Sequence, residues 1–270
     1  MRNKIKFLFP LLVILILAYW PIAHAQGYDG NISGQDSIQV ELDEPPVKSS
    51  PTGVQGSSCR HSYPVPETRG HVGSNAGEEF PFRTYVTPDD MAIQILAGQV
   101  NGVEEAYKVA VQWTYVSEQE LNHVADKWLT PHEFLANTPH YSNNPLQGVE
   151  VSDCEEQANT LVSLIRAEGI RPEEVRVALG EVIFNDIKTG HAWVELLIKG
   201  DWVALDPGLG PYWDGEAGKL IRRQGIPFDH YASHTYPVLQ AWAYYSDIYF
   251  LDPGKGRGDA PSSWYTITQV

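Results

Sequence analysis

The sequence predicts an α+β domain in which helices precede an antiparallel sheet and pack against it. A helical apolar pattern runs from Cys154 through Ile165, and Gly169 follows at the position of a C-cap glycine. The chain then changes to three segments rich in β-branched and aromatic residues, at 175–184, 191–198 and 202–205. Helices followed by consecutive strands joined by short turns are typical of an α+β layer structure.

The first turn of the predicted helix contains Cys154, the candidate nucleophile. Ser152 and Glu155 fit a capping box, with Ser152 as the N-cap residue and Glu155 at the third helical position. This assignment places Cys154 in the first turn, near backbone N–H groups and the positive end of the helix dipole. A thiolate is stabilised there, and the thiolate is the nucleophilic form of cysteine.

A cysteine nucleophile needs a base and a group that orients the base. His191 opens the second predicted strand and Asp206 follows the third. If Lys199–Asp201 closes a hairpin, the start of one strand lies beside the end of the next, so His191 and Asp206 become neighbours. The sequence therefore predicts that Cys154, His191 and Asp206 act together.

These residues stand in three motifs, Asp153-Cys154-Glu155, Gly190-His191-Ala192-Trp193-Val194-Glu195, and Trp202 with Leu205-Asp206-Pro207. In this order the motifs resemble the transglutaminase-like superfamily, which has the papain-like thiol-enzyme fold. The resemblance covers about residues 85–210 and is strongest over 150–208. It implies a catalytic triad of Cys154, His191 and Asp206 on a helix packed against an antiparallel sheet. Ser152 stands where many members have glycine.

The resemblance implies an enzyme that acts on peptide or amide bonds through a thioester acyl-enzyme. We expect a hydrolase, a cysteine peptidase or amidase, because water is the default acceptor. Two alternatives stay open: protein-glutamine acyl transfer, which is transglutamination, and a catalytically silent cell-surface interaction module. The oxyanion hole is expected to use the backbone N–H of Cys154 and one donor from Trp113, Tyr115 or Trp128. No cofactor or metal is expected.

Four segments are predicted along the chain, namely a signal peptide at 1–25, a flexible Pro/Gly/Ser-rich linker or pro-segment at 26–79, a catalytic core at 80–210, and an aromatic and Gly-rich extension packed on the core at 211–270. Residues 1–25 combine basic residues, an apolar run and small residues before a cleavage position after Ala25. We therefore expect a secreted or extracytoplasmic protein, with an uncleaved membrane anchor as the alternative.

Composition limits the partners of the chain. The 19 Lys and Arg residues face 34 Asp and Glu residues, which gives a formal net charge of −15. This charge argues against nucleic acid and anionic membrane surfaces, both of which attract basic patches. The expected partner is a peptide or protein substrate, without nucleic acid and without stable membrane association unless the signal stays uncleaved as an anchor.

The chain has one other cysteine, Cys59, and a disulfide between the two is an alternative to a free nucleophilic Cys154. Exported proteins commonly oxidise paired cysteines, so a Cys59–Cys154 disulfide would be structural, or reversible and able to mask the nucleophile. Three weaker expectations concern the second half of the chain. A helix is expected around 238–245, Glu195 is expected to face solvent, and His230 with His234 has the i, i+4 spacing of metal ligands on a helix.

Overall fold

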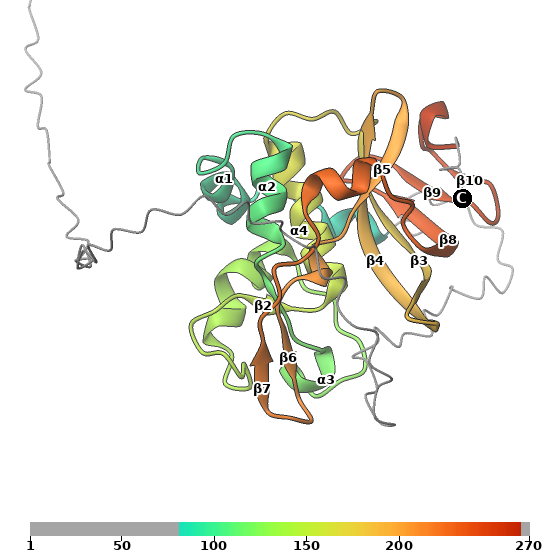
Figure 1. Ribbon diagram of the computed structural model, residues 1–270. Coiled ribbons are helices and arrows are strands. Elements are labelled where there is room, and N and C mark those ends of the chain that lie inside the picture. Colours follow the sequence, from blue (N-terminus) through green and yellow to red (C-terminus); the bar gives the residue numbers. More distant parts are fainter. Residues whose placement is uncertain (1–80, 266–270) are drawn as a thin grey trace, which may run out of the picture. The chain divides into compact units, whose positions relative to one another are not determined.

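Helix α4 (Cys154–Ala167) lies against one face of a six-stranded sheet and carries the predicted nucleophile at its start (Figure 1). The computed structural model describes residues 81–265. The sheet has the order β10-β9-β8-β3-β4-β5, and every pairing in it is antiparallel. The predicted α+β class is therefore confirmed. The predictions for 1–79, including the signal peptide, the linker and Cys59, lie outside the described residues.

The helical elements are η1 (Pro81–Tyr85), α1 (Met91–Ala97), α2 (Val103–Ala110), α3 (Glu118–Leu121), the π-helical turn η2 (Glu133–Asn137), η3 (Thr138–His140), α4, η4 (Pro207–Leu209), η5 (Phe228–Ala232) and η6 (Ser262–Tyr265). The strands are β1 (Thr114–Tyr115), β2 (Val151–Ser152), β3 (Val175–Phe184), β4 (Ile187–Ile198), β5 (Asp201–Leu205), β6 (Tyr212–Asp214), β7 (Lys219–Ile221), β8 (Val238–Tyr245), β9 (Phe250–Asp252) and β10 (Arg257–Gly258). Within residues 81–265, no helix combines the length and apolar character that a membrane span requires.

Strands β3, β4 and β5 form where the sequence predicted three strands, joined by two tight hairpins. Asn185 and Asp186 turn the first hairpin with φ angles of 50° and 64°, a conformation that Asn and Asp tolerate. Lys199 and Gly200 turn the second, also with positive φ. The first turn is shorter than predicted because β4 already begins at Ile187. The apolar face of α4 packs on β3 and β4, and these elements share one buried core.

Strand β8 occupies the region where the sequence predicted a helix, and that prediction was wrong. β8 pairs antiparallel with β3, and its inner residues Ala243 and Tyr245 are buried. The conformation of this segment is determined by its pairing with β3. The spacing of apolar residues in a short aromatic segment does not distinguish a helix from a strand. Close contact between the two strands depends on Gly180. A Cβ atom at this position would lie 2.3 Å from the Gln240 carbonyl oxygen.

A second, smaller sheet joins the segment that precedes Cys154 to the segment that follows Asp206. Its order is β2-β1-β6-β7, and β1 pairs in parallel with both β2 and β6. Tyr115 lies opposite Ser152 on one side and opposite Tyr212 on the other. The sheet thereby fixes the chain just before Cys154 and the chain shortly after Asp206.

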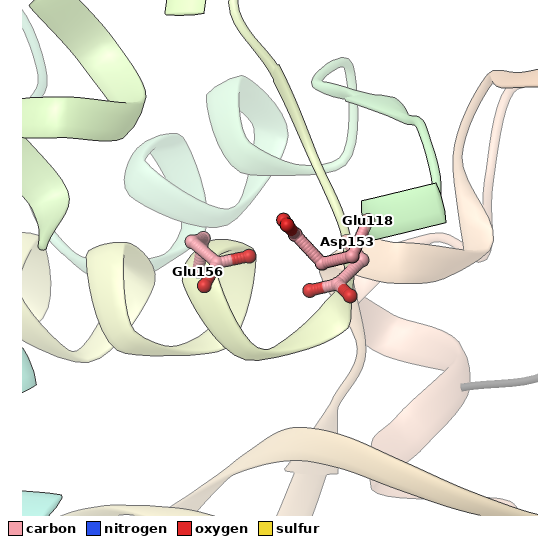
Figure 2. A group of neighbouring side chains, drawn as sticks. All are labelled: Glu118, Asp153 and Glu156. Carbon is pink, nitrogen blue, oxygen red and sulfur yellow. The ribbon is translucent and has the colours of Figure 1, made fainter. Parts of the chain in front are cut away.

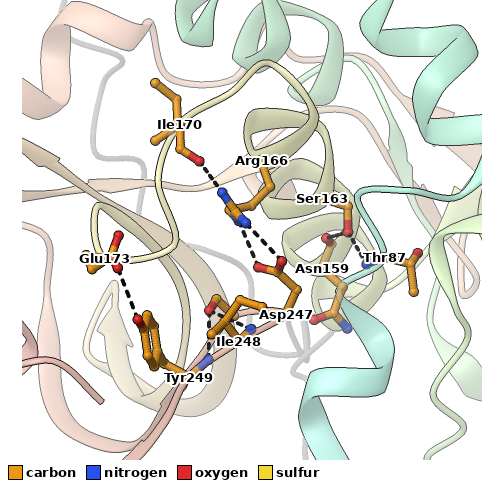
Figure 3. A network of polar contacts seen from close by, with 10 residues as sticks. Thr87, Asn159, Ser163, Arg166, Ile170, Glu173, Asp247, Ile248 and Tyr249 are labelled. Atoms are coloured by element: carbon orange, nitrogen blue, oxygen red, sulfur yellow. Dashed lines mark hydrogen bonds and ion pairs between the residues drawn. The ribbon is translucent and has the colours of Figure 1, made fainter. Parts of the chain in front are cut away.

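Two arginines, one partly buried and one fully buried, connect the core to the last part of the described chain. Arg166 of α4 binds both carboxylate oxygens of Asp247 at 2.8 and 3.0 Å, and it also donates to the carbonyl of Ile170 (Figure 3). On the other side of the sheet, Arg176 is fully buried and pairs with Glu195 at 2.6 Å. The expectation that Glu195 faces solvent was therefore wrong, because Glu195 neutralises an arginine inside the protein.

The Arg176 guanidinium is also enclosed by aromatic rings. Its central carbon lies 3.8 Å from the Trp202 ring centre, 3.7 Å from that of Tyr244 and 5.4 Å from that of Trp264. Trp264 accepts a hydrogen bond from Arg176 through its carbonyl oxygen at 3.0 Å. Residues after 210 thus complete the interior of the sheet and do not merely cover its surface.

Candidate active site

Cys154 is the first residue of α4 and is fully buried. The predicted capping box is wrong, because the N-cap residue is Asp153 and its side chain makes no capping hydrogen bond. Ser152 belongs to strand β2, and pairing with Tyr115 holds it in the extended conformation one position too early to cap the helix. The position of Cys154 in the first turn is as predicted, so the helix dipole favours a thiolate there.

The Cys154 sulfur is disulfide-bonded in the structure. The other cysteine of the chain, Cys59, lies outside the described residues. Any nucleophilic chemistry therefore belongs to the reduced form of Cys154. The sulfur also lies 3.0 Å from Oε2 of Glu155, so a carboxylate stands beside the candidate nucleophile.

The structure brings His191 and Asp206 together, as the hairpin argument predicts. His191 Nε2 lies 2.8 Å from Asp206 Oδ2, and both residues are buried. Burial of the ring by itself lowers the pKa of His191. The negative charge of Asp206, its hydrogen bond to the ring and the charge of Glu155 outweigh burial, so the pKa is raised above its ordinary value. An imidazolium is thereby stabilised next to the helix start.

Gly208 marks the point where all three predicted residues meet. A methyl group built on Gly208 would lie 3.4 Å from His191 Cε1 and 3.8 Å from Cys154 Cβ. It would also lie 3.2 Å from Asp206 Oδ1, which accepts a hydrogen bond from the Gly208 backbone N–H at 2.9 Å. Cys154, His191 and Asp206 thus surround one small residue. Their catalytic roles stay predictions.

Asp252 and the histidine pair His230 and His234 do not join this group. Asp252 has the same local sequence as Asp206, but its carboxylate accepts from the Lys255 N–H at 2.9 Å and pairs with the Lys255 ammonium at 3.3 Å. His230 and His234 flank the end of the short 3-10 helix η5, and their rings stack with centres 3.7 Å apart. His234 Nδ1 lies 2.9 Å from the His230 carbonyl oxygen. The i, i+4 spacing predicted that both imidazoles stand on one face of an α-helix, but the two residues do not lie on an α-helix.

The three residues predicted as possible second donors to the oxyanion hole have different surroundings in the structure. Trp113 packs against Phe134 with ring centres 5.2 Å apart, and Trp128 packs against Phe82 at 5.3 Å. Tyr115 is buried opposite Ser152 in the sheet that leads to Cys154. Of the three, Tyr115 is the one that sheet pairing fixes to the strand directly preceding the nucleophile.

A buried group of carboxylates, which the sequence analysis did not identify, lies at the start of α4. Glu118, Asp153 and Glu156 each offer an oxygen, and these oxygens lie within 4.8 Å of one another (Figure 2). Asp153 and Glu156 stand three residues apart at the helix start, and α3 supplies Glu118. The acidic run around Cys154 was a visible signal, but the contribution of Glu118 depends on tertiary structure.

Burial raises the pKa values of all three acids. The pKa of Glu118 rises to about 7 and that of Glu156 to about 8, with desolvation as the largest cause. Burial and the charges of Glu155 and Glu156 raise the pKa of Asp153 well above its ordinary value. Asn122 donates to Glu118 Oε2 at 2.7 Å, and the Leu129 N–H donates to Glu156 Oε1 at 2.8 Å. Within the described chain, Glu118 Oε1 and Glu156 Oε2 are buried and have no hydrogen-bond partner.

Comparison with known proteins identifies a family for this region. Residues 98–207 match the model of the transglutaminase-like superfamily. No curated protein matches the chain. Among solved structures, calcium-bound LapG of Legionella pneumophila aligns at 15% identity and a TM-score of 0.38, over 67% of this chain and 96% of LapG.

A second similar structure is a putative cysteine protease from Cytophaga hutchinsonii. It aligns at 18% identity and a TM-score of 0.33, over 50% of this chain and 43% of that longer protein. The matched region holds the predicted nucleophile, base and orienting carboxylate, and it spans α2 through the start of η4. Residues 98–207 of this chain therefore match the transglutaminase-like superfamily, the family that the three sequence motifs resemble.

Proposed function

We propose that this protein is an exported thiol hydrolase that cleaves peptide or amide bonds with reduced Cys154. The contact between His191 and Asp206, joined at Gly208 to the start of the cysteine helix, carries the proposal. A raised histidine pKa and a helix N-terminus both favour the thiolate–imidazolium pair that a cysteine nucleophile needs.

The proposed reaction uses one nitrogen of His191 for each partner. Nε2 binds Asp206, which leaves Nδ1 to exchange a proton with Cys154. The thiolate attacks the amide carbonyl carbon, and the Nδ1–H of the imidazolium gives its proton to the departing amine. Nδ1 then takes a proton from water, the resulting hydroxide attacks the thioester carbonyl, and the sulfur leaves as thiolate. Asp206 stays ionised and stabilises the imidazolium.

Activity of the reduced protein tests this proposal. The full chain, treated with a thiol reductant, is incubated with a mixed peptide library, and new termini are identified by mass spectrometry. We expect cleavage that Cys154→Ala and His191→Ala abolish, while Cys59→Ala retains it. Cleavage by Cys154→Ser equal to that of wild type would overturn the proposal.

The same reduced protein distinguishes the two alternative functions. Transglutamination predicts incorporation of a labelled primary amine into a glutamine-containing protein, and hydrolysis predicts cleavage without such incorporation. A silent interaction module predicts neither reaction, and it also predicts that iodoacetamide labels reduced Cys154 no faster than an ordinary thiol. The family match over 98–207 favours an enzyme over a silent module.

We further propose that Glu118, Asp153 and Glu156 hold a calcium ion beside the nucleophile. The donor set consists of carboxylate oxygens, which hard cations such as Ca²⁺ prefer, and it contains none of the thiolate or imidazole ligands typical of structural zinc. The two buried oxygens without partners support this assignment. Bound calcium would neutralise negative charge next to Cys154, where carboxylates otherwise oppose formation of a thiolate.

Calorimetric titration of the reduced and the oxidised protein with calcium tests this site. Wild type should bind one ion, and Glu118→Gln or Glu156→Gln should weaken binding at least about tenfold. Glu120→Gln removes a nearby exposed carboxylate and should leave affinity unchanged. Equal affinity of all three variants and wild type, or no heat of binding in wild type, would overturn the calcium proposal without affecting the triad.

Export is the remaining part of the proposal. It is supported by the basic, apolar and small-residue order of 1–25 and by the strongly acidic composition of the rest. Expression in a bacterial host should give a mature protein that starts at Gln26, as N-terminal sequencing of the extracytoplasmic fraction would establish. A chain recovered with Met1 intact in the membrane fraction would instead identify an anchor.

A further inference from the structure

The Asp206 carboxylate is fully buried and accepts three hydrogen bonds from three different parts of the chain. Oδ1 accepts from the Gly208 N–H at 2.9 Å. Oδ2 lies 2.8 Å from His191 Nε2 and also accepts from the hydroxyl of Tyr236 at 2.5 Å. The phenol and the imidazole thus share one carboxylate oxygen. A carboxylate held by several donors has little freedom to rotate away from the ring that it orients.

Tyr236 comes from the segment between η5 and β8, beyond the part of the chain that matches the superfamily. Its ring centre lies 5.4 Å from that of Trp193 and 6.0 Å from that of Phe184. Phe184 in turn meets the His191 ring edge-to-face at 5.9 Å. Strand β4, which carries His191, and its neighbour β3 therefore also position Tyr236.

The surroundings keep the Tyr236 hydroxyl protonated. Burial and the charge of Asp206 raise the pKa of Tyr236 well above its ordinary value, so the phenol keeps its proton at neutral pH and can donate it to the carboxylate. Two further tyrosines support the same segment without reaching the carboxylate. Tyr107 donates to the Ile226 carbonyl at 2.8 Å, and its oxygen lies 3.3 Å from both the Tyr231 hydroxyl and the backbone carbonyl oxygen of Asp206.

We propose that Tyr236 is a positioning residue of the active site, acting through Asp206 on His191. The assignment rests on the proposed function, and it adds to the triad a fourth side chain from outside the superfamily core. The phenol fixes the carboxylate in the plane that His191 requires, and it withdraws part of the negative charge that would otherwise act on the imidazole alone. Tyr236 touches neither sulfur nor substrate in this assignment.

The test compares Tyr236→Phe with two matched variants in the full, reduced protein. Tyr249→Phe removes a hydroxyl that binds Glu173, and Tyr107→Phe removes one that contacts the Asp206 backbone carbonyl but not its carboxylate. Turnover of the peptide identified for wild type is measured together with the titration of His191 by NMR of histidine-labelled protein. The His191 signal is assigned by its absence in His191→Gln.

For Tyr236→Phe we expect kcat to fall about 10- to 100-fold with KM changed less than about twofold. The midpoint of the His191 titration should rise by about 0.5 to 1 pH unit, because Asp206 then acts on the imidazole alone. Tyr249→Phe should leave that midpoint in place. Tyr107→Phe removes a hydrogen bond to the Asp206 backbone and not to its carboxylate, so it should move the midpoint less than Tyr236→Phe does, even if it lowers the melting temperature. A second comparison uses Asp206→Asn, in which adding Tyr236→Phe should change kcat less than twofold.

An unchanged His191 titration in folded Tyr236→Phe would overturn the proposal, and so would a fall in kcat that merely follows the loss of thermal stability. If Tyr236→Phe does not fold, biosynthetic incorporation of 3-fluorotyrosine provides the second measurement. A more acidic phenol donates more strongly and should lower the His191 midpoint, and no change would overturn the proposal. The titration needs no turnover, so a protein that cleaves no peptide still decides the role of Tyr236.

Discussion

Gly208 is the residue on which the geometry of the site depends most directly. Gly208→Ala would place a methyl group 3.4 Å from His191 Cε1 and 3.8 Å from Cys154 Cβ. The closest contact is Asp206 Oδ1 at 3.2 Å, so the carboxylate that orients the imidazole has to shift by a few tenths of an ångström. A misplacement of about 1 Å in an active site can cost about 100-fold in rate. We expect kcat/KM to fall by about 10- to 100-fold while the melting temperature changes little.

The chain contains a matched control for this substitution. Gly254 ends the sequence Leu251-Asp252-Pro253-Gly254, which repeats the one that ends at Gly208. A methyl group on Gly254 would meet only Asp252 Oδ1, at 3.5 Å. Gly254→Ala should therefore keep full activity, and equal losses in the two variants would show that the crowding at Gly208 does not act through the triad.

Local sequence predicted that Cys154, His191 and Asp206 would lie together, because each stands at the boundary of a strongly patterned element. It failed where long-range pairing decides the conformation. Ser152 looks like a helix cap until β1 pairs with it, and Glu195 looks exposed until Arg176 is placed beside it. Glu118 and Tyr236 reach the site from distant segments, and no spacing rule connects either of them to Cys154 or Asp206.

At the scale of elements, the pairing of β3 with β8 is the contact that the sequence analysis missed. Gly180→Ala tests it, since the added methyl group would lie 2.3 Å from a β8 carbonyl oxygen and 2.9 Å from the Trp193 ring. Forcing backbone apart in a packed sheet costs about 1 to 3 kcal/mol or more, which lowers the melting temperature by roughly 3 to 10 °C.

Thermal unfolding of Gly98→Ala provides the comparison for Gly180→Ala. Gly98 has an ordinary φ of −66°, and a methyl group there would approach carbonyl oxygens no closer than 3.6 Å. Its melting temperature should stay within about 2 °C of wild type or rise slightly. Equal melting temperatures for Gly180→Ala and wild type would mean that β8 does not lie on β3 as described.

At the scale of the whole molecule, the carboxylates at the start of α4 make stability depend on pH. Glu118 and Glu156 have folded pKa values of about 7 and 8, above the ordinary value of 4.5. The folded state therefore binds protons more tightly than the unfolded state, and this contribution is complete below about pH 4.5. It is lost as the pH rises through about 7 to 8.

Melting temperatures in calcium-free buffer should consequently fall between pH 6 and pH 9. The melting temperature of the double variant Glu118→Gln/Glu156→Gln should fall less over this range, because neither glutamine side chain titrates. Added calcium should restore wild type at pH 9 and leave the double variant unchanged. A melting temperature of wild type that rises over this range would show that the carboxylates are not desolvated as the structure describes.

Hydrogen bonds between the core and the C-terminal segment also determine at what stage of synthesis the protein can fold. Arg83 binds Asp259, 176 residues away, and Arg176 binds the Trp264 carbonyl, 88 residues away. Folding slows as contacting residues lie farther apart in sequence, because each long loop must close before its contacts form. A ribosome-bound chain that ends before residue 236 lacks Tyr236, one of the three donors to the Asp206 carboxylate, and the last partners of Arg176. The site is thus completed only after residue 236 and the segment that follows it have been synthesised, and a shorter nascent chain carries Cys154 without these contacts.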